Sequence, residues 1–413
     1  MLSRRCFLGT AGAALLAPHL HAAEPAKKKL AVVTNVWHDR SHAWHMAERF
    51  LHGYPVEGKW HRPPVEVVSA YVDQTPDNDL SRGRAKEFGF KIYPSVAEAL
   101  RCGGDKLAVD AVLVIGEHGK YPRNEFNQIE YPRYDYFKKI TDVYAKDGRT
   151  APIFNDKHLS YKWERAKEMV EISRTMKFPF LAGSSLPLTW RMPAVDMPHG
   201  AEVEEVMCLA FGGVDVYDFH AHETIQCMAE RRKGGETGVV AVQGLKGESV
   251  WKLLGEEKVA RLFEACLCRS QTLEQPPATS HRRPTPAQMR EWVKEPVAHR
   301  VEYADGLKST MLLLNGLVKD FTFAARLKGE KEPLSVLFHL PPNPNVTYSA
   351  ALMSKAEEMF VTGKAPYPIE RTLLTSGINA AGLKSLATGE KRLDTPHLAV
   401  KYNVGKESLF WRT

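Results

Sequence analysis

Residues 30–72 read LAVVTNVWHDRSHAWHMAERFLHGYPVEGKWHRPPVEVVSAYV. Leu30–Val36 is a short apolar run rich in β-branched residues, which is typical of a buried strand. Residues 41–51 have apolar side chains at helical spacing, and Val65–Val72 is a second β-branched run. Residues 53–64 are rich in glycine and proline, and we expect a loop there. The stretch therefore predicts a strand, a helix and a second strand in succession.

The same alternation continues to residue 182. Ala108–Ile115 is another buried strand, and it is followed by further helices and strands. The remaining predicted elements are helices at 81–87, 95–101, 134–146 and 161–176 and strands at 91–93 and 152–155. Alternating helices and apolar strands are typical of a doubly wound parallel sheet with helices on both faces. We therefore predict an α/β, Rossmann-like domain over residues 28–182.

The pattern changes after Leu181, where strands follow one another and turns such as Asp305-Gly306 lie between some of them. The predicted strands are 202–211, 238–245, 301–303, 309–314, 320–327 and 335–340, and the predicted helices are 223–232, 251–270 and 349–360. This order predicts a C-terminal α+β domain over residues 183–413 with a largely antiparallel sheet.

The N-terminus carries an export signal. Arg4 and Arg5 are followed by Phe7-Leu8, then by the apolar run Gly9–Ala17, with small residues at Ala22-Ala23. This pattern predicts a twin-arginine signal peptide over residues 1–23 and transient contact with the Tat translocase. We therefore expect the mature protein in the periplasm or outside the cell.

The composition argues against two classes of partner. The net charge of +7 is spread along the chain, and only Lys27–Lys29 forms a run, so no nucleic-acid-binding patch is expected. The apolar run at the N-terminus is too short to span a bilayer, and no other stretch qualifies.

Several polar residues follow predicted strands where a dinucleotide would lie. Asp73 ends the second strand, where an acid accepts hydrogen bonds from ribose hydroxyls. The first turn departs from G-x-G-x-x-G, because no glycine occurs between Leu30 and Leu51. The candidate cofactor-binding residues are Thr34, Asn35, His38, Arg40, Ser41, Asp73, Glu117, His118 and Lys157. The atypical turn does not distinguish NAD from NADP.

The first turn also holds three histidines. On a helix His38, His42 and His45 share a face, and such a set can ligate a transition metal. They can equally line a cleft. We do not expect a metal.

Two groups of residues suit acid–base chemistry. Asp156-Lys157-His158 directly follows a strand, so Lys157 lies at the sheet edge and can polarise a substrate hydroxyl. His220 can accept a proton, and Glu223, three residues later, can hold its tautomer. His158, Arg191 and Tyr217 are candidate substrate-binding residues.

With these residues in view, the chain resembles the Gfo/Idh/MocA family of glucose–fructose oxidoreductases and inositol dehydrogenases, in a divergent, exported bacterial branch. The family's second strand ends in an acid, as at Asp73. Its Glu-Lys-Pro motif is similar to Asp156-Lys157-His158, and its His-x-x-Asp motif is similar to His220-Ala221-His222-Glu223.

The resemblance implies an NAD- or NADP-dependent oxidoreductase acting on a sugar or cyclitol. It implies cofactor and substrate contacts for Lys157, proton transfer for His220 and support from Glu223, with His222 as the rival base. Open sheets of this kind often pair face to face, so we expect a homo-oligomer.

Two alternatives remain open from the sequence. One is a non-redox carbohydrate lyase or hydrolase on the same scaffold, with or without a metal. It would use the cluster of His38, Asp39, His42, Glu117, His118 and His158. The other is a carbohydrate-binding protein without catalysis, which would need neither Lys157 nor His220.

Overall fold

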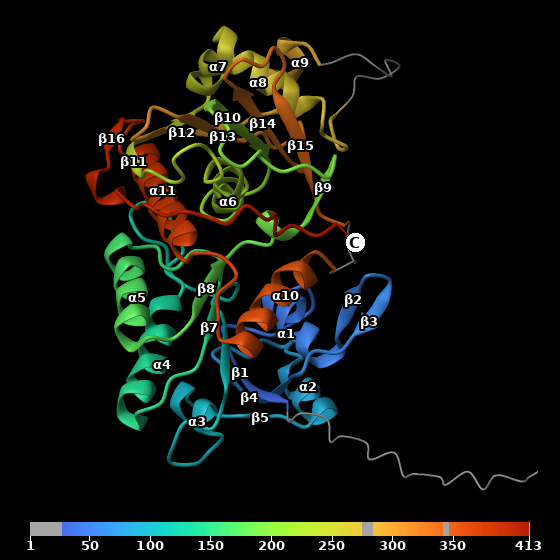
Figure 1. The fold of residues 1–413 in the computed structure, drawn as a ribbon, viewed down its shortest axis with the longest axis vertical. Helices are drawn as coiled ribbons and strands as arrows, with labels where there is room; N and C mark the ends of the chain where they lie inside the picture. Colours follow the sequence, from blue (N-terminus) through green and yellow to red (C-terminus); the bar gives the residue numbers. More distant parts are fainter. Residues whose placement is uncertain (1–26, 275–283, 342–346, 413) are drawn as a thin grey trace, which may run out of the picture.

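The computed structural model describes residues 27–274, 284–341 and 347–412. Two sheets, each covered by helices, follow one another along the long axis of the molecule (Figure 1). The signal peptide predicted over residues 1–23 lies outside the described residues, so export stays a prediction. Among the described residues, no helix has the length and apolar character needed to cross a membrane.

The first sheet has six parallel strands in the order β5-β4-β1-β6-β7-β8. They are β1 (Lys28–Thr34), β4 (Val65–Val72), β5 (Lys91–Ile92), β6 (Ala111–Ile115), β7 (Ile153–Asp156) and β8 (Phe180–Gly183). The strand order reverses direction between β1 and β6. In open α/β sheets a ligand crevice forms at that point, outside the carboxyl ends of the strands.

Helices cover both faces of this sheet. Met46 and Phe50 of α1 share one core with Leu352 and Met359 of α10, while α3, α4 and α5 cover the other face. The helices of this half are α1 (His42–His52), α2 (Ser81–Phe88), α3 (Val96–Arg101), α4 (Arg133–Asp147), α5 (Trp163–Met176) and α10 (Thr347–Thr362). The predicted Rossmann-like sheet is confirmed. The chain also returns α10 to this half from far beyond residue 182.

The second sheet has eight strands in the order β16-β11-β12-β13-β10-β14-β15-β9. Only the pairing of β10 with β13 is parallel, so the predicted, largely antiparallel sheet is confirmed. The strands are β9 (Trp190–Met192), β10 (Val203–Ala210), β11 (Val239–Lys246), β12 (Val297–Tyr303), β13 (Lys308–Leu313), β14 (Phe321–Leu327), β15 (Leu334–His339) and β16 (Leu393–Asp394).

The second sheet is also covered on both faces. Helices α6 and α11 pack on one face and α7, α8 and α9 on the other. They are α6 (Tyr217–Ala229), α7 (Glu248–Leu254), α8 (Glu257–Leu267), α9 (Pro286–Trp292) and α11 (Glu370–Ala387), with short 3-10 turns η1 (Leu186–Leu188) and η2 (Pro396–Leu398). The homo-oligomer stays a prediction.

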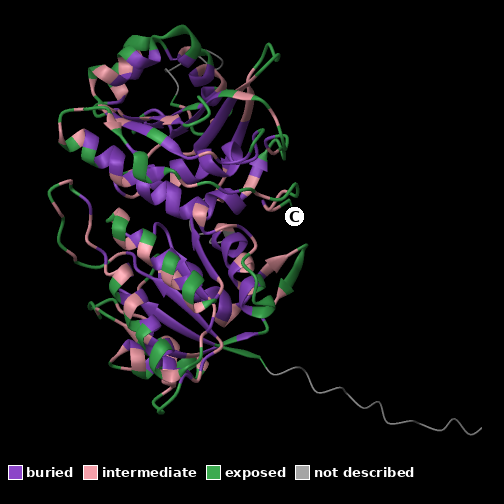
Figure 2. Ribbon diagram, turned by 60° about the vertical axis from the view of Figure 1, so that its left-hand side comes forward, coloured by how far each residue is buried: buried purple, intermediate pink, exposed green. Residues whose placement is uncertain are grey.

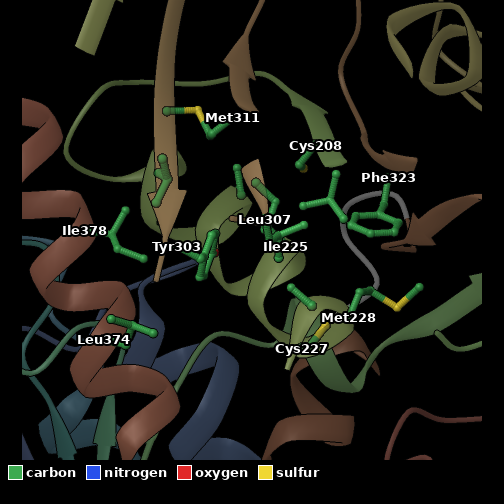
Figure 3. Close-up of a cluster of buried hydrophobic side chains, with 14 of the residues drawn as sticks. Cys208, Ile225, Cys227, Met228, Tyr303, Leu307, Met311, Phe323, Leu374 and Ile378 are labelled. Carbon is green, nitrogen blue, oxygen red and sulfur yellow. The ribbon is translucent and has the colours of Figure 1, made fainter. Parts of the chain in front are cut away.

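One buried cluster anchors α6, the helix that carries His220. Ile225 and Met228 of α6 lie in this cluster with Leu374 and Ile378 of α11 (Figure 3). Figure 2 shows buried residues throughout both sheets and in the helices between them. The position of α6 at the junction of the two halves is therefore set by a continuous apolar core.

Three local predictions were wrong. Residues 53–64 contain a hairpin, β2 (Tyr54–Val56) and β3 (Lys59–His61), because Glu57 and Gly58 both take positive φ and form a two-residue turn. The single helix expected over 251–270 is two helices, α7 and α8, since Gly255 ends the first and Glu256 is extended. Helix α6 begins at residue 217 rather than 223, so His220 and Glu223 lie inside it.

Candidate active site

A cavity of about 170 Å³ lies where the carboxyl ends of β6, β7 and β8 meet α6. Larger hollows occur elsewhere in the described chain, but this one gathers most of the predicted catalytic side chains. Its lining comprises His42, His45, Met46, Glu117, His118, Asp156, Lys157, Ser184, Ser185, Leu186, Val216, Tyr217, His220, Phe321, Leu340 and Tyr348.

Lys157 follows β7 directly and is buried. Its backbone has φ 63° and its amide donates to Gly183 O at 3.2 Å, which ties the turn to β8. The Lys157 ammonium lies 3.9 Å from Glu117 Oε1, and Arg133 Nη2 donates to Glu117 Oε2 at 2.5 Å. One carboxylate thus pairs with two buried cations, and Asp156 adds a second buried carboxylate to the same cavity.

The charge state of Glu117 follows from its neighbours. Burial alone would raise the pKa of Glu117, but the charges of Lys157 and Arg133 outweigh burial and hold it below its usual range. Glu117 therefore stays ionised and pairs with the Lys157 ammonium inside the cavity.

His220 reaches the cavity from α6. Its Nδ1 lies 2.5 Å from Ser184 Oγ, which also accepts the Leu186 amide at 3.1 Å. Burial, followed by the charge of Lys157, lowers the pKa of His220 well below its ordinary value, so the imidazole is neutral near pH 7. Ser184 Oγ can accept Nδ1–H, and that tautomer leaves Nε2 as a proton acceptor.

Glu223 supports this arrangement indirectly. Its Oε2 accepts the Ser184 amide at 3.3 Å and its Oε1 accepts the Thr375 hydroxyl at 2.6 Å. Burial raises the pKa of Glu223 to about 7. The Glu223 carboxyl group therefore positions Ser184, and Ser184 in turn positions the His220 ring.

A second histidine in the cavity has an acidic partner. His42 Nδ1 lies 2.6 Å from Asp156 Oδ2, although 114 positions separate the two residues in the chain. Ser41 begins α1 by accepting the Trp44 amide, which places His42 in the first turn beside the sheet edge. The His118 ring lies 5.0 Å from that of His42, and burial, followed by His42, lowers the pKa of His118 to about 4.

Comparison with known proteins gives the fold a name. No protein-family model and no curated protein sequence matches the chain. Among solved structures, GenD2 from gentamicin A biosynthesis, in complex with NAD, superposes with a TM-score of 0.56 at 12% identity, over 90% of this chain and 97% of GenD2. The myo-inositol dehydrogenase from Lactobacillus casei, in complex with NAD(H) and myo-inositol, gives 0.53 at 12% identity over 92% and 98%. The chain has the Gfo/Idh/MocA dehydrogenase fold.

A further inositol dehydrogenase shows the same extent of similarity. The enzyme from Corynebacterium glutamicum superposes with a TM-score of 0.53 at 12% identity, over 89% of this chain and 98% of its own. Both sheets are therefore part of the shared Gfo/Idh/MocA fold, and the family predicted from sequence matches these structural neighbours.

Within this fold, the turn after β1 is packed with side chains. Asn35 is buried, its Nδ2 donates to His118 O at 3.0 Å, and its Oδ1 accepts the Tyr136 hydroxyl at 2.8 Å. Thr34 Oγ1 donates to Ile115 O, and Trp37 is fully buried. Thr34 and Asn35 therefore tie β1 to β6, which corrects their prediction as cofactor contacts.

The outer part of the same turn remains accessible. Arg40 is exposed, with φ 59°, and contacts Asp39 at 3.7 Å. Ser41 Oγ is engaged by the amides of His38 and Trp44 at the start of α1. Arg40 is therefore the cation of this turn that an anionic ligand would meet.

Asp73 lies at the end of β4, where the sequence predicted it. The carboxylate is exposed and accepts hydroxyl hydrogen bonds from Tyr71 and Tyr121, each at 2.7 Å. A carboxylate has about four lone-pair sites, so further hydrogen bonds can be accepted.

Two predicted site residues lie away from the cavity. His222 Nε2 contacts His299 Nδ1 at 2.9 Å in the core beneath the second sheet, because it lies on the opposite side of α6 from His220. Arg191 is buried in β9 with Asp196 at 2.5 Å. Neither lines the cavity, so the structure corrects their assignment as base and substrate contact.

The histidines of the first turn lie near one another, with the His45 ring 6.3 Å from that of His42 and the His38 ring 5.9 Å from that of His118. His45 contacts the Tyr348 hydroxyl at 3.0 Å, and burial lowers the pKa of His45 to about 3. Over the described residues, no group of three or more His, Cys, Asp or Glu is placed to hold a metal ion. His158 lies behind Lys157, with Nε2 2.9 Å from Arg133 Nη1, and does not line the cavity.

Sequence reasoning missed Ser184, Arg133 and Tyr348 as site residues. Ser184 follows β8 directly, so its strand-end position was a usable signal. Arg133 starts α4 and Tyr348 lies in α10, and nothing local links either residue to this crevice.

Proposed function

We propose that this protein is an oxidoreductase that oxidises a secondary alcohol of a sugar or cyclitol with NAD or NADP. The observation that carries the proposal is the meeting of Lys157 and His220 in one cavity at the carboxyl edge of a Rossmann-like sheet. The fold similarity to NAD-complexed dehydrogenases supports it.

The residues present fit a nicotinamide dinucleotide in a modified form. The exposed carboxylate of Asp73 would hold ribose hydroxyls. Arg40 and the start of α1 would meet the phosphates in place of glycine amides. Lys157 would lie at the nicotinamide end. When bound, the dinucleotide would supply the hydride acceptor.

The chain's own residues supply the proton chemistry. The Lys157 ammonium positions the substrate hydroxyl and stabilises the negative charge that develops on its oxygen. His220, neutral through its lowered pKa, accepts the hydroxyl proton at Nε2. Ser184 holds the ring through Nδ1, and Glu223 holds Ser184.

The test is nucleotide content. Protein purified from its native export compartment and then denatured should release NAD(H) or NADP(H), detected by mass spectrometry. If the purified protein has not retained a nucleotide, added NAD(H) or NADP(H) should raise its melting temperature. With nucleotide present, the protein should oxidise myo-inositol, scyllo-inositol or glucose. The proposal is contradicted if no nucleotide is released, neither nucleotide shifts the melting temperature and none of these substrates is oxidised.

A second candidate is a non-redox carbohydrate lyase or hydrolase in the same cavity. It is favoured by the side-chain-filled turn, in which Asn35 and Trp37 are buried. If no nucleotide binds and a keto sugar or glycoside is still converted, this candidate replaces the first.

We also propose export by the twin-arginine route, supported by Arg4-Arg5 and the following apolar run. Replacing Arg4 and Arg5 by lysine should leave the protein in the cytoplasm, because the pathway reads the arginine pair. Cell fractionation with immunoblotting measures this, and unchanged export of the double variant would contradict it.

A further inference from the structure

The proposed oxidation does not use His42, the cavity histidine that is paired with Asp156. His42 Nδ1 and Asp156 Oδ2 are 2.6 Å apart, with side chains 18% and 1% exposed. Over the described residues, the other oxygen of Asp156 is buried without a hydrogen-bond partner. Asp156 is therefore committed to His42.

This geometry prepares His42 to accept a proton. A carboxylate that accepts Nδ1–H fixes the tautomer, leaves the Nε2 lone pair outward and stabilises the imidazolium that forms. His42 and His220 both line the cavity, one from α1 of the first half and the other from α6 of the second. The cavity thus holds two positioned imidazoles, each with its own orienting partner.

One proton acceptor is sufficient for alcohol oxidation. A second suits chemistry at the carbon next to the carbonyl that oxidation creates, because that C–H is acidified by the carbonyl group. Oxidation also leaves a proton on His220 and the Lys157 ammonium nearby, so the acid needed at the carbonyl oxygen is already present. This inference rests on the substrate class of the proposed function. Removal of a proton next to the carbonyl requires only the chain's own side chains.

We propose that His42, positioned by Asp156, removes a proton from the carbon adjacent to the carbonyl of a bound keto cyclitol or keto sugar. The C–H bond breaks and its proton passes to His42 Nε2. The electron pair forms a C=C bond, and the carbonyl oxygen takes a proton from the Lys157 ammonium, or from His220 where a preceding oxidation has protonated it, to give an enediol. Return of a proton to carbon restores the ketone with exchanged or inverted hydrogen. No oxidant is consumed.

The experiment uses the full mature protein and 2-keto-myo-inositol in D₂O without added nucleotide. Proton NMR should show loss of the signals of the hydrogens next to the carbonyl, at a rate above that of buffer. His42→Gln should lower this rate by about 10²–10⁴-fold, the usual contribution of a general base. His52→Gln, at the half-buried end of the same helix and outside the cavity, should leave it unchanged.

Asp156→Asn separates positioning from folding. The amide preserves shape but cannot stabilise the imidazolium, so kcat for exchange should fall at least tenfold with little change in KM. Circular dichroism and the unfolding midpoint check that both variants fold. If the His42–Asp156 contact is purely structural, Asp156→Asn should lower the unfolding midpoint and leave kcat for exchange unchanged. That result would overturn the proposal.

The outcomes separate this proposal from the function on which it rests. Nucleotide-dependent oxidation by the wild type without ketone exchange would overturn the role of His42 and leave the oxidoreductase standing. Exchange without any nucleotide binding would support His42 and reject the redox function. Exchange that His42→Gln leaves intact would assign the base to another residue.

Discussion

Lys157→Met should lower kcat for alcohol oxidation by about 10³-fold, which corresponds to about 4 kcal/mol of transition-state stabilisation. The ammonium is the buried cation that lines the cavity, and methionine keeps the length of the side chain while removing the charge. Glu117 keeps its ion pair with Arg133, so the loss does not strand a buried carboxylate. Steady-state kinetics with a cyclitol that the wild type oxidises measures the effect.

The matched control is Lys167→Met, an exposed lysine on α5, which should change kcat less than twofold. Lys157→Arg retains the charge and should recover part of the rate. An increase in KM with kcat unchanged would show that Lys157 only binds substrate. A loss smaller than about tenfold in kcat would reject its proposed role in stabilising the transition state.

The protein should lose stability steeply below pH 6.5. Six buried or half-buried histidines have a pKa lowered mainly by burial, so the folded state excludes protons that the unfolded state binds. They are His45, His118, His158, His220, His222 and His299. Stability is therefore lost as the pH falls from 6.5 towards the folded pKa values, which reach about 4 for His118 and about 3 for His45.

Three buried acids oppose this trend. Burial raises the pKa of Asp215 to about 8, of Asp218 to about 6 and of Glu223 to about 7. As the pH falls, these acids bind protons in the folded state at a higher pH than in the unfolded state. They therefore contribute stability as the pH falls from about 8 towards 4. The six histidines outnumber these three acids, so the net slope is a loss of stability as the pH falls below 6.5.

Urea unfolding at pH 7.5, 6.5 and 5.5 measures this slope. His222→Gln should flatten it by about one proton, or about 1.4 kcal/mol per pH unit, because that buried site no longer titrates in the unfolded chain. His199→Gln, an exposed histidine, should leave the slope unchanged. A free energy of unfolding that is flat between pH 7.5 and 5.5 would contradict the prediction.

Most elements of the first sheet could be predicted because their signals are local. Val65–Val72 was predicted with the bounds that the structure shows, and the other main strands differ by a few residues at their ends. β-Branched runs specify buried strands wherever the neighbours come from. The hairpin β2/β3 was missed because its turn at Glu57-Gly58 depends on two positive φ angles within a loop-like composition.

The candidate site was predictable where chemistry follows strand ends. Lys157 and Glu117 could be placed at one edge because parallel strands end on the same side of a sheet. Thr34 and Asn35 satisfied the same rule, yet their side chains bridge β1 to β6. Strand-end position shows where a side chain lies, but its partners decide whether a ligand can reach it.

The two kinds of sheet, and the sheet edge at which polar residues collect, could be predicted from the amino-acid sequence because both follow from short-range patterns of apolar and polar side chains. Which polar residues pair became clear only from the folded chain. His42 meets Asp156 across 114 positions, His220 meets Ser184 across 36, and His222 turns to His299 in the core. These pairs depend on the packing of α1 and α6 against β7 and β8, and no local sequence pattern encodes that long-range packing.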